Sequence, residues 1–81
     1  MRVTVRLFAR LRDIAGTAEF VREAPAGATV ADVWRALVTE FPEMARYDAS
    51  ISAAVNADYA KMNVALADDD EVAFLPPVSG G

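Results

Sequence analysis

The 81-residue sequence contains no cysteine and no histidine. Without cysteine, the chain can form no disulfide, no thiol nucleophile and no thiolate metal site. Without histidine, it also lacks the commonest general base and the commonest protein ligand for metals. The sequence therefore predicts neither an independent catalyst nor a metal protein.

Positive charge and long apolar segments are also scarce. Eight basic residues stand against twelve acidic ones, which gives a net charge of −4. Nucleic acid binding normally needs a basic face, so it is disfavoured. No apolar run approaches the ~20 residues that span a bilayer, and Met1 leads directly into an alternating pattern rather than a signal peptide. We expect a cytoplasmic protein that binds neither nucleic acid nor membrane.

The periodicity of apolar residues predicts one small domain. Alternation over residues 2–8 is typical of a half-buried strand. A stripe of apolar residues spaced three and four apart follows Thr29, a good N-cap residue, and predicts an amphipathic helix that Pro42 ends. The expected elements are strands over 2–8, 17–23, 51–55 and 72–75, helices over 9–15 and 30–41, an extended piece around Tyr59, and a loop over 43–50.

The order of these elements, ββαβ(β)β, supplies one long helix for one mixed sheet. If the first and last strands are neighbours, they run parallel and the helix makes a right-handed crossover. This is the ubiquitin-like β-grasp arrangement, an α+β fold with a short helix after the first strand. We expect the β-grasp domain to comprise residues 1–75 and a flexible tail to comprise residues 76–81.

The tail has the sequence Pro-Pro-Val-Ser-Gly-Gly. The two prolines favour an extended chain that leaves the sheet, and the glycines bury no surface. A frayed terminus is one interpretation. The other is a functional arm, because a tail without Cβ atoms can enter a narrow channel and bring its carboxylate to a nucleotide phosphate. These residues alone leave both interpretations open.

Both ends of the sequence resemble the small subunits of molybdopterin synthase, a family of sulfur carriers. Residues 5–16, VRLFARLRDIAG, are similar to the family signature Phe-Ala-x-Leu/Val-Arg-Glu/Asp-x-x-Gly. Residues 54–56 (AVN) and 69–81 (DDEVAFLPPVSGG) are closer still. The ending from Pro76 to Gly81 is the specific part. One departure is Asp69, where relatives often carry glycine.

The resemblance implies that the Gly81 carboxylate is the reactive group. An E1-like adenylyltransferase would convert it to an acyl-adenylate with ATP, and a sulfur donor would then form the thiocarboxylate, 1-thioglycine. Inside the large synthase subunit, this sulfur would be delivered to a cyclic pyranopterin monophosphate. Gly80 would allow the tail to extend into the site of the large subunit. The chain would be a sulfur-donating subunit of a heterotetramer, with no bound cofactor and no catalysis of its own.

The resemblance further implies an apolar docking patch on the sheet near the exit of the tail. Phe8 lies on the polar side of its strand or just past the strand's end, and Tyr59 and Leu75 are added as candidates. An ordinary exposed aromatic remains the alternative for Phe8, and a core role the alternative for Leu75. The tail residues assigned to partner binding are Pro76, Pro77, Val78 and Ser79.

Three further functions stay open on the sequence alone. A sulfur carrier for thiamine thiazole synthesis shares the fold and the Gly-Gly end. A ubiquitin-like modifier would transfer the same activated carboxylate to a lysine. A β-grasp interaction domain with an inert tail would use no carboxylate chemistry at all.

Overall fold

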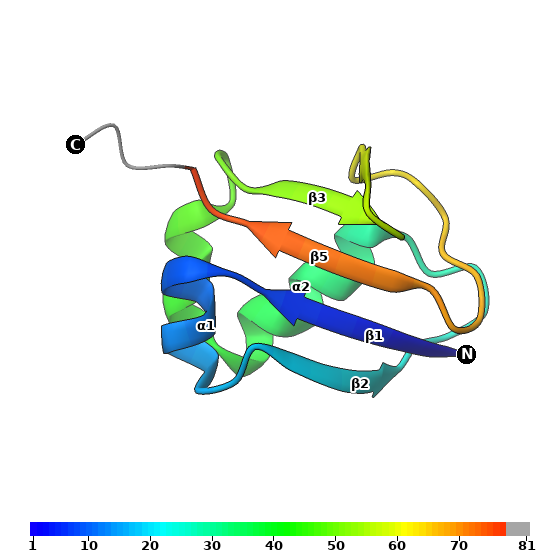
Figure 1. Ribbon diagram of the computed structural model, residues 1–81, viewed down its shortest axis with the longest axis horizontal. Coiled ribbons are helices and arrows are strands. Elements are labelled where there is room, and N and C mark those ends of the chain that lie inside the picture. The colour runs from blue at the N-terminus through cyan, green and yellow to red at the C-terminus, as the bar shows by residue number, and fades with distance from the viewer. Residues whose placement is uncertain (78–81) are drawn as a thin grey trace.

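In the computed structural model, which describes residues 1–77, a five-stranded sheet packs against one main helix (Figure 1). The expected α+β class is confirmed. The elements are β1 (Arg2–Leu7), α1 (Ala9–Ala15), β2 (Glu19–Glu23), α2 (Val30–Glu40), the 3₁₀ helix η1 (Pro42–Tyr47), β3 (Ser52–Val55), β4 (Asp58–Ala60) and β5 (Glu71–Leu75).

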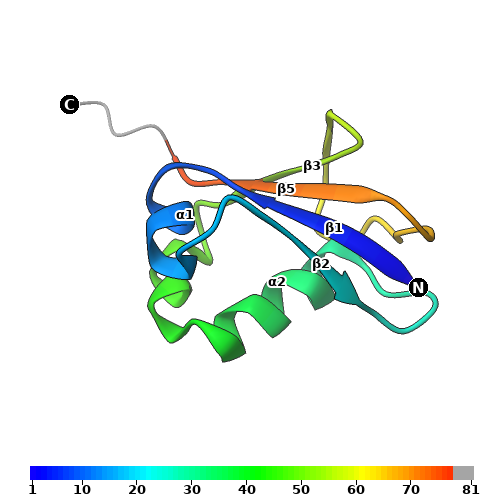
Figure 2. The same cartoon turned by 60° about the horizontal axis from the view of Figure 1, so that its bottom comes forward.

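The strands lie in the order β2-β1-β5-β3-β4. The central pair, β1 and β5, is parallel, and the other three pairs are antiparallel. This confirms the predicted parallel pairing of the first and last strands, and the arrangement is the β-grasp fold. Figure 2 shows α2 crossing one face of the sheet, which leaves the opposite face without a covering helix.

The core lies between α2 and the inner face of the sheet. Its centre is an aromatic pair, Trp34 of α2 and Phe74 of β5, with ring centroids 5.1 Å apart. Helix α2 begins with a capping box in which Thr29 and Asp32 each accept a backbone N–H of the other, at 3.2 Å and 2.9 Å. The side chains with the least exposure are Phe74, Leu7, Leu11, Met44, Val3, Val5, Val30 and Val72.

The prediction of a loop over 43–50 was wrong for its first half. Pro42 stands in the first turn of η1, where its missing N–H costs no hydrogen bond. Met44 lies in this helix and its side chain is fully buried in the core. Asp48, the residue that follows the helix, accepts a 2.8 Å hydrogen bond from the indole N–H of Trp34. A single buried residue in so short a helix produces no visible periodicity, so the apolar pattern carries no signal for it.

Among residues 1–77, none of the helices has the length and apolar composition needed to cross a membrane.

Candidate functional site

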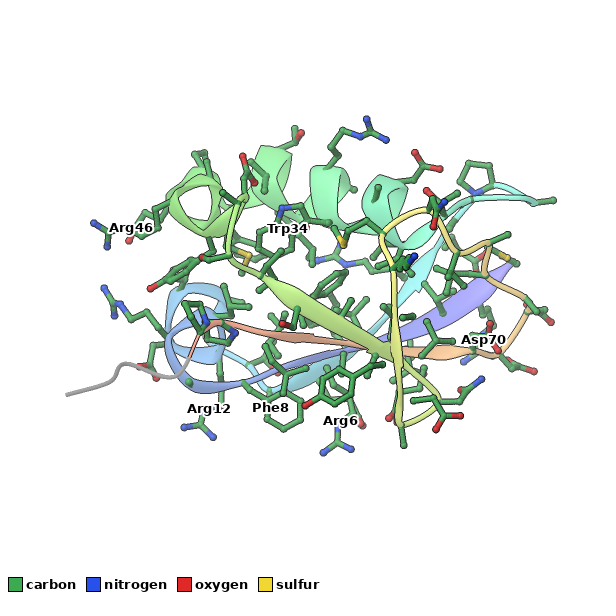
Figure 3. All side chains as sticks on the ribbon, turned by 90° about the horizontal axis from the view of Figure 1, so that it is seen from above. Arg6, Phe8, Arg12, Trp34, Arg46 and Asp70 are labelled. Atoms are coloured by element: carbon green, nitrogen blue, oxygen red, sulfur yellow. The ribbon has the colours of Figure 1, made fainter. Side chains whose placement is uncertain are left out.

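The predicted docking residues lie on the sheet face opposite α2. Alternation along β5 buries Phe74 against the core and turns Leu75 to the opposite face, where it is half-buried. A purely core role for Leu75 is therefore wrong. Figure 3 shows Phe8 and Arg6 on this same side of the sheet, away from Trp34.

The outer face forms a shallow groove, which we call the outer-face groove. Cross-strand register aligns Ala73 of β5 with Arg6 of β1 on one side and with Ala54 of β3 on the other. Ala54 is in turn opposite Tyr59 of β4, whose exposed fraction is 82%. The full lining is Arg6, Phe8, Ala54, Ala57, Tyr59, Glu71, Ala73 and Leu75. The structure thus brings together all three of the predicted residues Phe8, Tyr59 and Leu75.

Phe8 lies just past the end of β1 rather than within it. It occupies the N-cap position of α1 with extended backbone angles, φ −124° and ψ 155°, and makes no side-chain capping bond. The extended angles continue the alternation of β1 for one more residue, so the ring stays on the outer face. Its exposed fraction of 37% leaves the ring available for contact.

A second groove adjoins the first at the end of β5. Figure 1 shows this end of β5 near α1. It shares Phe8 and Leu75 with the outer-face groove, and its remaining lining residues are Ala9, Arg10, Tyr47, Pro76 and Pro77. Pro76 and Pro77 therefore join the patch directly. Of the predicted tail residues, Val78, Ser79, Gly80 and Gly81 lie outside the described residues.

Arg6 fixes one rim of the outer-face groove. Its guanidinium lies 5.5 Å from the centroid of the Phe8 ring, and its nitrogens lie 3.7 Å from Glu71 and 3.6 Å from Glu19. Exposed ion pairs of this kind contribute little individually, but three partners together restrain one long side chain. Arg6, Ala54 and Ala73 were not among the residues predicted from the sequence, although strand alternation alone places them on the outer face.

A polar network holds the turn that presents Tyr59. Asn56 donates from its side-chain amide to Asp70 at 2.9 Å and accepts the Glu71 N–H at 2.9 Å, so it ties the β3–β4 turn to the start of β5. Asp70 also accepts the Ala67 N–H at 2.8 Å. The hydrogen bonds from the Ala67 N–H and, to a smaller extent, from the Asn56 amide lower the pKa of the Asp70 carboxyl below its ordinary value.

Asp69, the departure from the family pattern, adopts the conformation that the usual glycine favours. Its φ is +67°, in the left-handed region that aspartate tolerates better than most residues. The backbone conformation at this position is therefore one that glycine would also adopt.

No three His, Cys, Asp or Glu residues lie close enough together within residues 1–77 to hold a metal ion.

Comparison with known proteins supplies a family and a set of relatives. A family model described as the ThiS family matches residues 5–81. The chain is also 34% identical to the molybdopterin synthase sulfur carrier subunit of Chlamydomonas reinhardtii over 83 aligned residues, which cover 100% of both chains. The matched regions include both grooves and the Gly-Gly ending.

Two solved structures extend the comparison. The crystal structure of small archaeal modifier protein 1 from Haloferax volcanii superimposes with a TM-score of 0.86 at 34% identity, covering 100% of both chains. A complex of subunits 1 and 2 of molybdopterin-converting factor from Helicobacter pylori contains a chain that matches with a TM-score of 0.69 at 27% identity, again over 100% of both chains.

Proposed function

Because the chain belongs to the ThiS family, we propose that it is the sulfur carrier subunit of a molybdopterin synthase. The resemblance to small subunits of this enzyme is confirmed by the family match and by the full-length relative that bears the name. The observation that carries the proposal is the extent of that similarity, since the match includes the Gly-Gly ending as well as the domain.

We place the reactive group at the Gly81 carboxylate. One of its oxygens would attack the α-phosphorus of ATP in an E1-like enzyme, which forms the acyl-adenylate and releases pyrophosphate. A donor of sulfide-level sulfur would then attack the acyl carbon and displace AMP, which leaves a thiocarboxylate. In the large subunit, the thiocarboxylate sulfur would attack a cyclic pyranopterin monophosphate, displace an oxygen substituent and form a thioester. Water would then cleave the acyl C–S bond, which leaves the sulfur on the pterin and returns the Gly81 carboxylate. Two such deliveries would supply the two sulfurs of the dithiolene.

The described residues supply a docking surface for the partners in this chemistry. The outer-face groove and the adjoining groove at Pro76 and Pro77 share Phe8 and Leu75 and so form one continuous, mostly apolar surface. A partner seated on this surface would receive the tail without a further docking site. The Helicobacter pylori complex of subunit 1 with subunit 2 supports a partner subunit for this chain, and we propose a heterotetramer with the large subunit.

A protein modifier is the second candidate, and the similarity to the archaeal modifier favours it. The same acyl-adenylate would then acylate a lysine amine of a target protein, with loss of AMP. The family match alone does not distinguish a thiamine thiazole carrier from a molybdopterin carrier, but the full-length relative at 34% identity bears the molybdopterin name. The interaction domain with an inert tail has no comparable observation in its favour.

Intact-mass spectrometry tests the carboxylate chemistry. The full chain is incubated with an E1-like adenylyltransferase, ATP and a sulfur donor, and we expect the mass change for replacement of one oxygen by sulfur at Gly81. Deletion of Gly80 and Gly81 is the control and should abolish this change. An unchanged mass with an enzyme that thiolates another carrier would overturn the proposal.

Reconstitution distinguishes the candidate functions. The thiolated chain, mixed with a large synthase subunit and the cyclic precursor, should yield molybdopterin. Isopeptide conjugates to lysines in place of molybdopterin would identify a modifier, and thiazole formation would identify the thiamine carrier.

A further inference from the structure

The free edge of β2 lies at the opposite end of the sheet from β4 and Tyr59. Main-chain hydrogen bonds of the β1–β2 pair join Met1 with Ala24, at 2.7 Å and 2.8 Å, and Leu7 with Ala18, at 2.9 Å. In an antiparallel pair the residues that face the partner alternate. The backbone groups of Glu19, Val21 and Glu23 therefore point away from β1.

Thr17 closes one end of this edge. Its hydroxyl donates to the Glu19 carbonyl at 3.1 Å and accepts the Glu19 N–H at 3.5 Å. Val21 and Glu23 remain, each with a backbone N–H and C=O directed toward solvent. Two such residues present a short template on which another extended chain could form four hydrogen bonds.

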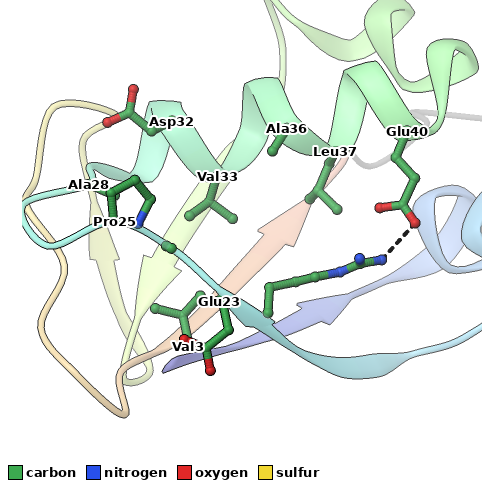
Figure 4. A pocket seen from close by; sticks show the side chains of 11 residues that line it. Val3, Glu23, Pro25, Ala28, Asp32, Val33, Ala36, Leu37 and Glu40 are labelled. Atoms are coloured by element: carbon green, nitrogen blue, oxygen red, sulfur yellow. Dashed lines mark hydrogen bonds and ion pairs between the residues drawn. The ribbon is translucent and has the colours of Figure 1, made fainter. Parts of the chain in front are cut away.

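A groove runs between this edge and α2 (Figure 4). Its floor and far wall are apolar, formed by Val3, Ala28, Val33 and Leu37. The Arg22–Glu40 ion pair, at 2.7 Å, bridges the groove from β2 to α2. Side chains alternate along a strand, so every second residue of an added strand would point into this groove.

The outward side chains of β2 have an acid–apolar–acid pattern. Val21 has an exposed fraction of 50%, and the side chains of Glu19 and Glu23 on either side of it are 59% and 77% exposed. A second copy paired antiparallel about Val21 would place Glu19 opposite Glu23 at both ends. Like charges directly opposite are destabilising, so the pattern disfavours self-pairing. Arg6 lies 3.6 Å from Glu19 and the N-terminal ammonium lies 3.9 Å from Glu23, but both carboxylates remain mostly exposed. A partner with basic side chains can therefore still pair with them.

We propose that the β2 edge binds an extended segment of another protein, antiparallel to β2, with an apolar residue flanked two positions away on each side by lysine or arginine. The apolar residue pairs with Val21, and the two cations pair with Glu19 and Glu23. The intervening residues are apolar and enter the groove above Val33. The β2 edge lies at the opposite end of the sheet from Tyr59, and it meets the outer-face groove at the Arg6–Glu19 ion pair.

Nuclear magnetic resonance of the ¹⁵N-labelled full chain tests the proposal with the peptide acetyl-Ser-Lys-Val-Ile-Val-Lys-Ser-amide. We expect saturable binding with a dissociation constant below about 1 mM. Hydrogen exchange of the Val21 and Glu23 amides should slow, and the amide chemical shift of Val33 should change. A matched peptide with glutamate in place of both lysines should bind about tenfold more weakly or worse, because two attractive cross-strand pairs become repulsive.

Charge reversal on the protein is the complementary test. The double variant Glu19→Lys/Glu23→Lys should prefer the glutamate peptide. The double variant Glu43→Lys/Asp58→Lys makes the same change of net charge elsewhere and should keep the original preference.

Three outcomes would overturn the proposal. Equal affinity of the wild-type chain for the lysine and glutamate peptides would show that binding does not depend on the charges of Glu19 and Glu23. This comparison uses the wild-type chain alone, so it does not depend on the folding of a variant. Shifts centred on Tyr59 and Leu75 would place the peptide in the outer-face groove. Concentration-dependent protection of Val21 without peptide would identify a second copy of the chain as the occupant.

Discussion

Ala54 of β3 and Ala73 of β5 are direct cross-strand partners on the outer face of the sheet. Their side chains end at Cβ, so the centre of this face stays low between Tyr59 on one side and Phe8 with Leu75 on the other. Any long side chain at either position would fill the groove. The alanine pair therefore determines whether the three predicted docking residues form one surface.

Replacement of Ala73 by arginine should block docking without unfolding the protein. The new side chain would occupy the floor of the groove and place a charge where an apolar partner residue is expected. We predict at least a tenfold loss of affinity for the large subunit, about 1.4 kcal/mol, measured by isothermal titration calorimetry. Stability should change by about 1 kcal/mol or less, since the side chain points away from the core but lies opposite Arg6.

Thr39→Arg is the matched control, because it adds the same side chain on the exposed face of α2. It should bind the large subunit as the wild type does. Equal loss of affinity in the two variants would show that added charge, and not the groove, causes the effect.

Tyr59 should contribute to partner binding and very little to folding. With 82% of the residue exposed, Tyr59→Ala removes few contacts within the chain. Aromatic residues at the centre of an interface often contribute about 2 kcal/mol or more, so we predict a loss of affinity of about 30-fold. Tyr59→Phe, which keeps the ring, should retain most of the affinity, and full retention by Tyr59→Ala would exclude Tyr59 from the interface.

The fold followed from the sequence because its elements have strong local signals. The alternation of Val3, Val5 and Leu7 and the helical stripe from Val30 to Phe41 predict elements that agree with the structure to within about two residues at each end. The helix ends at Glu40 because Phe41 precedes proline and takes a non-helical φ of −126° and ψ of 82°.

The grooves did not follow from the sequence, because they depend on pairing between distant strands. Alternation indicated that Leu75 and Phe74 face opposite sides, but only the register between strands aligns Arg6, Ala73 and Ala54 in one row. Alanine and arginine also carry no pattern that marks an interface. Aromatic residues were found more readily because an exposed ring is unusual on a polar face.

The Trp34–Asp48 hydrogen bond should stabilise the junction between α2 and η1. Trp34 is only 4% exposed, so Asp48→Ala would leave its indole N–H without this acceptor in a nearly buried position. We predict a loss of about 1–3 kcal/mol in the free energy of unfolding, measured by urea denaturation. Asp48→Asn keeps a carbonyl acceptor and should lose less than half as much, whereas equal losses would contradict a hydrogen-bond origin.

Asp70 should make the stability of the fold depend on acid pH. Its pKa in the folded protein is lower than the ordinary 3.8, because the Ala67 N–H and the Asn56 amide donate to the ionised carboxylate. A lowered pKa contributes stability that is fully present above pH 3.8 and is lost as the pH falls through the folded value. Asp70→Asn removes this contribution, so its urea midpoint should lie below that of the wild type at neutral pH, with the gap closing below pH 3.8.

Asp13→Asn, which removes one negative charge from the exposed side of α1, is the control and should show no such convergence. A gap between Asp70→Asn and wild type that stays constant from about pH 7 to about pH 2 would mean that the carboxylate charge does not stabilise this turn.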